Sequence, residues 1–245
     1  MEYRQDLLEK IVVSAAQYAV GKESASYTAV KGYLSGGDVA VNTYLKSVIS
    51  LHFPDDLILS EEDDYMCSPQ PDKYLWILDP ICGTTNYVRG IPFYAHSLSV
   101  LDADGVLYAG VYDPNRDELF LADRKQTTLN GNVVHTSGTK EIKDAVVAVD
   151  CNQSNKEAII IDLIYKLAPP ITRRVKIFES ANLELAYVAC GRLDGYVSIG
   201  DKIWDTVAGS LMISSASGET VGGFDMFIAT NGYLMETLVK CVGKN

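Results

Sequence analysis

The chain has 245 residues, of which 47% are hydrophobic and 22% are charged, which is typical of one large globular domain or two small, closely packed ones. Its 32 acidic and 21 basic residues give a formal charge of −11. This balance argues against a nucleic-acid backbone as a partner, because phosphate binding needs clustered lysine and arginine. The chain has no run of about 18 uninterrupted apolar residues, so no membrane span is expected.

The first half of the chain combines helical and strand patterns. Apolar residues at helical spacing predict helices at residues 3–20 and 39–53, the second ending at Pro54. Short apolar runs then predict strands, at residues 57–59, 74–78, 96–101, 106–112 and 118–122. The 74–78 strand is expected to end at Asp79. Helices followed by an antiparallel meander indicate an α+β fold.

The second half alternates more regularly between the two kinds of element. Strands are predicted at residues 145–149, 175–178 and 195–199, and helices at residues 156–167, 182–190 and 204–216. We therefore expect two lobes, residues 1–140 and residues 141–245, with metal-binding motifs in the first and the second completing the site.

Cysteine usage and the first residues bear on the compartment. The five cysteines are widely spaced and form no C-x-x-C pair, which disfavours a disulfide framework or a thiolate zinc site and favours a reducing cytoplasm. The opening residues, MEYRQDLLEK, carry acids where a secretory signal begins with basic residues.

Acidic residues stand at four boundaries between predicted elements: Asp38, Glu61 with Glu62, Asp79, and Asp205. Each follows or precedes an apolar run, so all of them can face one cleft. Mg²⁺ prefers oxygen ligands, usually one or two carboxylates with water and substrate phosphate. Helix capping and ordinary surface exposure explain acids at such positions equally well, so spacing alone leaves both interpretations open.

Two motifs resemble the signatures of a known family. Residues 79–86, DPICGTTN, resemble the first signature of the inositol monophosphatase family, Asp-Pro-Ile-Asp-Gly-Thr-Thr-Asn. Residues 204–209, WDTVAG, resemble its second signature, Trp-Asp-x-Ala-Ala-Gly, and Ser60-Glu61-Glu62 resembles its Gly-Glu-Glu. The motifs keep the family's order over nearly the whole chain. The resemblance implies a layered α/β/α/β/α sandwich, often a homodimer, that hydrolyses small-molecule phosphate monoesters with Mg²⁺.

The resemblance also implies metal ligands. Glu61, Asp79 and the carbonyl group of Ile81 would hold a first cation. Asp79 would bridge to a second cation held by Asp205, and Asp38 would support a third, weaker one. In such a site metal-bound water is acidified into a nucleophile, and paired cations stabilise the attacking and leaving oxygens.

Catalytic and substrate-binding roles follow from the same resemblance. Glu61, Asp38 and Thr84 would be catalytic, with Asp38 and Thr84 orienting the attacking water. Backbone N–H groups at the start of a helix would cradle the phosphate. The implied substrate-binding set is Cys82, Gly83, Thr84, Glu179, Ser180, Ala181, Ser198 and Asp205.

Cys82 is the main departure from the family, since it replaces an aspartate that ligates the second cation. A thiol is a poor ligand for Mg²⁺, so the second site is expected to be weakened or lost, unless a softer cation such as Mn²⁺ or Zn²⁺ fills it. Alternatively, Cys82 is a small, inert residue. A nucleophilic role is less favoured, because no histidine is close in sequence, although His96 could approach in space.

Other departures concern substrate recognition. Tyr27 and Gly32 align with a lysine and an aspartate of the family, and Ser198 aligns with a glutamate that contacts substrate hydroxyl groups. The family's Gly-Ser/Thr-Ala loop is Glu179-Ser180-Ala181 here, and the segment 219–227 is shorter than usual. Three functions stay open: a metal-dependent phosphatase of altered specificity, a family member recruited to another reaction on a small metabolite, or a catalytically impaired binding homologue.

Overall fold

The computed structural model describes residues 2–28, 32–63, 67, 70, 72–152 and 157–243. Its first sheet has seven strands in chain order, with β3 parallel to β4 and every later neighbour antiparallel. The strands are β3 (Leu57–Ser60), β4 (Leu75–Cys82), β5 (Ala95–Asp102), β6 (Gly105–Asp113), β7 (Glu118–Asp123), β8 (Thr127–Leu129) and β9 (Asn132–Val134). The predicted meander is therefore present, extended by two short strands.

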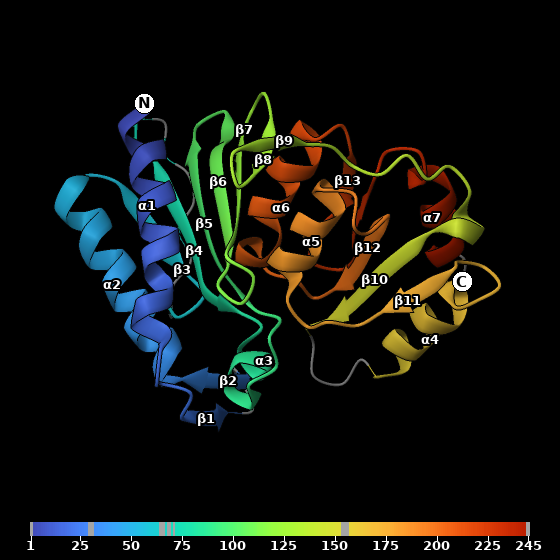
Figure 1. Ribbon diagram of the computed structural model, residues 1–245, viewed down its shortest axis with the longest axis horizontal. Helices are drawn as coiled ribbons and strands as arrows, with labels where there is room; N and C mark the ends of the chain where they lie inside the picture. Colours follow the sequence, from blue (N-terminus) through green and yellow to red (C-terminus); the bar gives the residue numbers. More distant parts are fainter. Residues whose placement is uncertain are drawn as a thin grey trace.

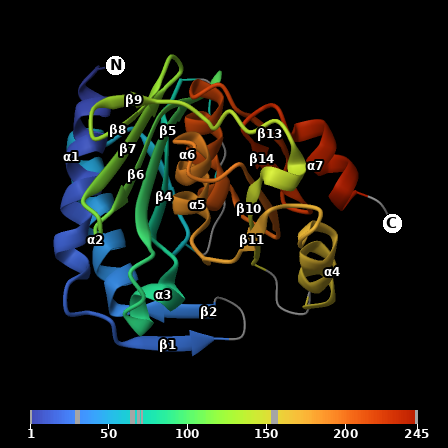
Figure 2. The ribbon, with the colours of Figure 1, turned by 45° about the vertical axis from the view of Figure 1, so that its right-hand side comes forward.

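Two helices cover the outer face of this sheet (Figure 1). They are α1 (Glu2–Ala19), which packs on β5 and β6, and α2 (Gly36–His52), which packs on β4. Leu8, Val12 and Ala15 recur at helical spacing in α1 and are buried, as the sequence predicted. Between the helices, β1 (Ala25–Thr28) and β2 (Gly32–Ser35) form a hairpin that lies beside the short helix α3 (Thr84–Arg89) (Figure 2).

The second sheet has five strands in the order β11-β10-β12-β14-β13. Its strand β10 runs parallel to β11 and β12, and β14 is antiparallel to its neighbours β12 and β13. The strands are β10 (Val146–Cys151), β11 (Arg174–Lys176), β12 (Gly195–Ile199), β13 (Glu219–Gly222) and β14 (Phe227–Thr230). Helices α4 (Glu157–Leu167) and α7 (Met235–Val242) cover its outer face, and a 3₁₀ turn η1 (Ile142–Asp144) precedes it.

Helices α5 (Ala181–Ala189) and α6 (Ile203–Ser215) lie between the two sheets (Figure 1). Every residue of α5 is buried, which suits a helix covered on all sides. The two helices approach closely at Gly209, where an added Cβ would lie 2.4 Å from the Cβ atom of Leu185. The layers are therefore α/β/α/β/α, which confirms the expected fold class. The division into lobes at residue 140 stays a prediction.

The strand ending predicted at Asp79 is wrong, because β4 continues to Cys82. Asp79 pairs with Ser97 and Cys82 with Ala95, so the ladder skips Pro80 and Ile81 in a bulge. The bulge accommodates a proline, which has no N–H group to donate to the ladder. It leaves the Ile81 carbonyl group free to accept a hydrogen bond from the hydroxyl group of Thr84 at 3.1 Å.

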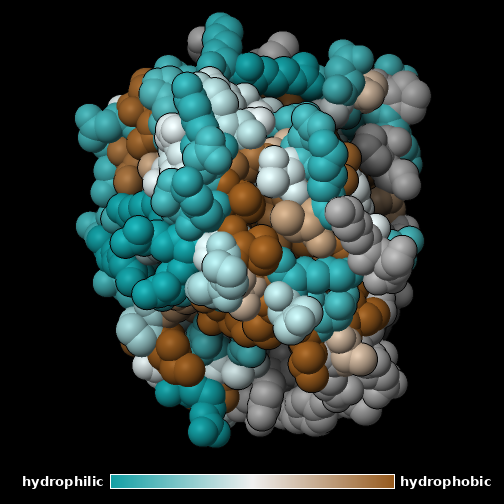
Figure 3. Space-filling view, turned by 90° about the vertical axis from the view of Figure 1, so that its right-hand side faces the viewer, coloured by the Kyte–Doolittle hydropathy of each residue, from teal (hydrophilic) through white to brown (hydrophobic). Residues whose placement is uncertain are grey.

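The end of the molecule that carries α4 and α7 exposes hydrophobic patches between hydrophilic ones (Figure 3). Large apolar side chains exposed on these helices include Ile161, Tyr165 and Val239. The predicted homodimer is not tested by this surface and stays a prediction. Among the described residues, no helix combines the length and the apolarity that a membrane crossing requires.

Candidate active site

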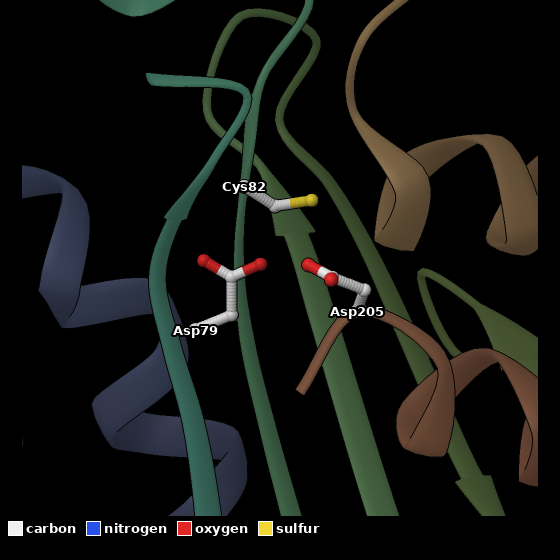
Figure 4. A group of neighbouring side chains, drawn as sticks. All are labelled: Asp79, Cys82 and Asp205. Atoms are coloured by element: carbon white, nitrogen blue, oxygen red, sulfur yellow. The ribbon is translucent and has the colours of Figure 1, made fainter. Parts of the chain in front are cut away.

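Asp79, Cys82 and Asp205 meet at the junction between the first sheet and the helices behind it (Figure 4). Asp79 and Cys82 lie on β4, and Asp205 lies in the first turn of α6. One side-chain donor atom from each lies within 4.8 Å of the other two, and all three residues are buried. The two family-like motifs, far apart in sequence, thus face one another.

Asp38 is fixed by a capping box at the start of α2. The backbone N–H and the hydroxyl group of Ser35 both donate to Oδ2 of Asp38, at 2.7 Å and 2.6 Å. The hydroxyl group of Thr84 lies 3.4 Å from the other oxygen, Oδ1. One carboxylate oxygen therefore serves the helix cap, and the second faces the site. Both the capping and the functional interpretation of Asp38 thus fit the geometry.

Glu61 follows β3, and its backbone N–H donates to the Leu78 carbonyl group at 3.1 Å, which places it beside the end of β4. The residue is half-buried by its accessible surface. Burial, followed by the charges of Asp79, Glu62 and Asp38, raises its pKa well above the usual range. Glu61 therefore belongs to the same electrostatic group as Asp79, as the sequence predicted.

Asp38, Glu61, Asp79 and Asp205, which we call the acid cluster, repel one another. Burial raises the pKa of Asp79 first and the charge of Asp205 second, and burial likewise dominates the raised pKa of Asp205. Among the described residues, no ion pair joins the acid cluster to a basic side chain. Moreover, Oδ1 of Asp79 is buried and has no hydrogen-bond partner there. Buried carboxylates without a counter-charge are costly, so the cluster suits a cation.

The Cys82 side chain is directed toward the start of α5. Its sulfur accepts the backbone N–H of Asn182 at 3.3 Å, and its carbonyl group accepts the Ser180 hydroxyl at 2.8 Å. Burial, then the charges of Asp79 and Asp205, raises the pKa of the thiol well above its usual range. Cys82 is thus a neutral thiol at neutral pH, which disfavours the nucleophilic role.

His96 has a structural contact instead of a catalytic one. Its Nδ1 atom lies 2.6 Å from the Pro80 carbonyl oxygen, and since a carbonyl only accepts, Nδ1 carries the proton. Burial lowers the pKa of His96 to about 4, so the ring is neutral. Among the described residues, no hydrogen bond joins it to Cys82.

The turn after β4 can be formed only by glycine. Gly83 precedes α3 with a φ of 97°, and an added Cβ would lie 3.0 Å from the Glu179 carbonyl oxygen and 3.2 Å from Cβ of Ser180. Asn86 ties the same two segments together, since its Nδ2 atom donates to the Phe178 carbonyl group at 2.6 Å. The predicted substrate segments 82–84 and 179–181 therefore lie against each other.

Glu179 occupies a glycine-like conformation with a φ of 60° and is exposed, whereas Ser180 and Ala181 are buried. A non-glycine residue in this region is strained, and such strain is concentrated at functional sites. The family's glycine at this position is thus explained by the backbone. The acid found here keeps the same conformation.

Ser198 does not reach the acid cluster but belongs to a second group, the Asp201 network, formed by Asn152, Tyr196, Ser198 and Asp201. The hydroxyl groups of Ser198 and Tyr196 donate to Oδ2 of Asp201 at 2.5 Å and 2.8 Å, and Nδ2 of Asn152 donates to Oδ1 at 3.0 Å. The resemblance aligns Ser198 with a glutamate of the family, and in this chain the carboxylate bonded to Ser198 comes from Asp201, three residues further along.

Two more buried acids adjoin this network. Asp150 is paired with Ser198 across β10 and β12, and burial followed by the Asp201 charge raises its pKa to about 7. The pKa of Glu184 is raised by burial and then by the Asp150 charge. Asp201 also raises the pKa of Asp205 in the acid cluster, so the two groups are electrostatically coupled.

Sequence reasoning missed Asn182, Asp150, Asp201 and Glu184. Asp150 directly follows the strand predicted at 145–149, and Asp201 lies two residues after the strand predicted at 195–199. Boundaries of this kind identified the other acids, so the signal was present. Asn182 begins the helix predicted at 182–190, where an asparagine is an ordinary capping residue, and Glu184 lies inside that helix, so neither was singled out. The side chains of residues 25–28 and 32–33 lie outside the described part, so the interpretation of Tyr27 and Gly32 stays a prediction.

Comparisons with known proteins agree with the motifs. The sequence profile described as "Inositol monophosphatase family" matches residues 13–239. The chain is 32% identical over 215 residues to "Nus factor SuhB" of Escherichia coli (strain K12), covering 84% of this chain and 79% of that protein. Among solved structures, extragenic suppressor protein suhB from Bartonella henselae has a TM-score of 0.91 at 26% identity, covering 99% of both chains.

A second solved structure, inositol monophosphatase from Anabaena (Nostoc) sp. PCC 7120, has a TM-score of 0.83 at 28% identity and covers 99% of this chain and 96% of that one. These similarities extend over both sheets.

Proposed function

Because the chain belongs to the inositol monophosphatase family, we propose that it hydrolyses a small-molecule phosphate monoester with a divalent cation, Mg²⁺ in the first instance. The observation that carries the proposal is the acid cluster. It brings together four carboxylates from β4 and from the boundaries of β3, α2 and α6, and among the described residues no ion pair joins them to a basic side chain.

The donors present fit one cation of this kind. Glu61 and Asp79 offer carboxylate oxygens, and the bulge in β4 presents the Ile81 carbonyl group. The buried Oδ1 atom of Asp79, which has no partner among the described residues, supports this assignment. When bound, the cation would acidify a water molecule and offset the negative charge of the phosphate. Hard oxygen donors of this type suit Mg²⁺ or Mn²⁺ better than Zn²⁺.

Asp38 and Thr84 are proposed to orient the attacking water. Both hydrogen bonds from Ser35 go to Oδ2 of Asp38, so Oδ1 is the oxygen available to accept a proton from water. The Thr84 hydroxyl has one proton and two acceptors within reach, Oδ1 of Asp38 and the Ile81 carbonyl group. Its remaining lone pairs can hold a water molecule against Asp38. Such positioning is the main contribution a protein makes to phosphoryl transfer.

The rest of the substrate is proposed to lie toward the exposed Glu179 and the Asp201 network. The charges of Asp201 and Glu179 help to raise the pKa of Asp150, and the charges of Asp201 and Asp150 help to raise the pKa of Asp205. An acidic lining opposes a second phosphate group and suits hydroxyl or cationic groups. We therefore expect a monophosphate of a polyol, a sugar or a related metabolite, not a bisphosphate.

A second candidate function follows from the name "Nus factor SuhB" carried by relatives at 32% identity. In this alternative the chain acts by binding another macromolecule. The departure at Cys82 is compatible with it. The expectation that no nucleic acid binds rests on the charge of −11 and stays a prediction, as do the cytoplasmic location and the homodimer.

Phosphate release tests the proposal directly. The purified protein is assayed against a panel of sugar and polyol phosphates with Mg²⁺, Mn²⁺ or Zn²⁺, beside Cys82→Asp and beside Glu61→Gln as a control for contaminating phosphatases. Metal-dependent release that Glu61→Gln abolishes supports the proposal. Release only by Cys82→Asp marks Cys82 as the lesion and favours the binding homologue, and no release by either form under any metal overturns the phosphatase assignment.

A further inference from the structure

Asn182 is a buried residue in the first turn of α5 whose side chain contacts both halves of the site. Its Nδ2 atom donates to Oδ2 of Asp79 at 2.9 Å and to the Trp204 carbonyl group at 3.0 Å. A backbone carbonyl only accepts hydrogen bonds, so the amide must present its NH₂ group here. Because Trp204 directly precedes Asp205, this NH₂ group lies on the side of Asp79 that faces α6.

The backbone of Asn182 engages the next donor of the same group. Its N–H donates to the Cys82 sulfur at 3.3 Å. Two of the three side chains that meet in Figure 4, Asp79 and Cys82, therefore direct lone pairs at one residue of α5. The third, Asp205, accepts the backbone N–H of Lys202 through Oδ2 at 2.7 Å, as a helix cap does.

This arrangement does not fit a second hard cation. A cation between Asp79, Cys82 and Asp205 needs the lone pairs that now receive N–H groups, and it needs oxygen where Cys82 offers a soft sulfur. The NH₂ group of Asn182 carries partial positive charge. It therefore stabilises Oδ2 of Asp79 as a cation would, though more weakly. The other oxygen of Asp79, Oδ1, has no hydrogen-bond partner among the described residues, so a first cation can bind it without displacing an N–H group.

We propose that Asn182 takes the place of the second cation, so that the chain binds one divalent ion, between Glu61, Asp79 and the Ile81 carbonyl group, where its relatives' motif provides for two. Asn182 and Cys82 act together: the amide supplies the positive end of a dipole to Asp79, and the thiol removes the oxygen that a second ion would need. This inference rests on the proposed function only in taking a divalent cation as the ligand.

Asp205 gains a different role in this arrangement. With no second ion to hold, its Oδ1 atom is free to accept a hydrogen bond from a substrate hydroxyl group. Cys82 and Asn182 therefore give this half of the site hydrogen bonds in place of a second set of metal ligands.

Equilibrium binding of Mn²⁺, counted by calorimetry and observed by electron paramagnetic resonance, tests the inference without turnover. We expect one tightly bound Mn²⁺ per wild-type chain with an uncoupled spectrum. The double variant Cys82→Asp/Asn182→Ala is expected to bind two, with the spin coupling typical of ions about 3.5–4 Å apart. The matched control Cys82→Ser/Asn182→Ala removes the same groups without adding a carboxylate and is expected to stay at one.

Two coupled Mn²⁺ ions in the wild-type chain would overturn the inference, as would no binding at all. The wild-type count is decisive even where a variant fails to fold, which a thermal melt reveals. One ion bound without phosphate release leaves the inference standing and defeats the proposed function. Two bound ions together with phosphate release would overturn the inference and leave the proposed function standing.

Discussion

The two sides of the acid cluster are built differently. On the side of β3 and α2, Glu61, Asp38 and Thr84 keep the residues that the family motifs require, and each is positioned by a backbone boundary or a helix cap. On the side of α5 and α6, Cys82 departs from the motif, and Asn182 donates hydrogen bonds to Cys82 and to Asp79. If the proposed function holds, the end of the site that would carry the reaction keeps the motif residues, and the departure at Cys82 lies beside it.

The largest expected effect tests the retained side. Glu61→Gln removes a carboxylate ligand, so phosphate release should fall by about 10²–10³-fold or more, comparable to the loss of a key electrostatic group. Because it also removes an ionisable group from a repelling cluster, the metal-free protein should be no less stable. Activity assays and thermal melts with and without Mn²⁺ measure both.

The exposed Glu236→Gln serves as the control for Glu61→Gln, and it should leave activity and the Mn²⁺-induced melting shift unchanged. Retention of near-normal turnover by Glu61→Gln would break the contrast, since the retained side would then not carry the reaction.

The second effect concerns His96, which contacts the Pro80 carbonyl group in the bulge of β4, between Asp79 and Cys82. Its pKa is about 4 in the folded chain against 6.5 for an unperturbed histidine, so the unfolded chain binds the proton first as pH falls. Its contribution is present above about pH 6.5 and is lost as pH falls toward 4, to a total of about 3 kcal/mol. Urea melts of wild type and His96→Asn, which keeps a donor for Pro80, should differ in their pH slope over this window.

If His96→Asn loses the same stability between pH 6.5 and 4 as wild type, the assignment of a neutral, buried imidazole to His96 is wrong. The raised pKa values of the acid cluster act in the opposite sense, because their metal-free form is stabilised by protonation. The comparison with the variant isolates the histidine.

The third effect tests the changed side. Asp201→Asn places an NH₂ or a single acceptor where three donors converge, so unfolding free energy should fall by about 1–3 kcal/mol. Tyr196→Phe removes one of those donors and should cost less, about 1 kcal/mol. In phosphate-release assays, Asp201→Asn should also lower the ratio of monophosphate to bisphosphate hydrolysis, because it removes a negative charge that opposes a second phosphate group. An unchanged preference would separate the Asp201 network from substrate recognition.

The smallest effect concerns Glu179. Replacement by glycine relieves the left-handed backbone and should stabilise the chain by up to about 1 kcal/mol, which corresponds to about 2–4 °C in melting temperature. Glu179→Ala removes the carboxylate but keeps the strained φ, so it should give no such gain. Equal melting temperatures for the two variants would contradict the strain.

Much of the reacting side could be predicted because its acids stand where elements begin or end and because residues 79–86 and 204–209 resemble the family signatures. The boundaries alone left helix capping equally possible. The length of β4 could not be predicted, because the strand continues beyond Pro80 through a bulge. Asn182 could not either, because its contact with Asp79 spans 103 residues and depends on how α5 packs between the sheets. Elements such as β13 (Glu219–Gly222) and β8 are four residues or fewer, too short for a periodic pattern.

The position of the bound cation tests the account most directly. Anomalous diffraction from crystals grown with Mn²⁺ locates the metal without any assumption about the reaction. We expect one peak per chain, between the Glu61 and Asp79 carboxylates and beside the Ile81 carbonyl group, with the Asn182 amide still bonded to Asp79. A peak between Asp79, Cys82 and Asp205, alone or as a second site, would contradict the account.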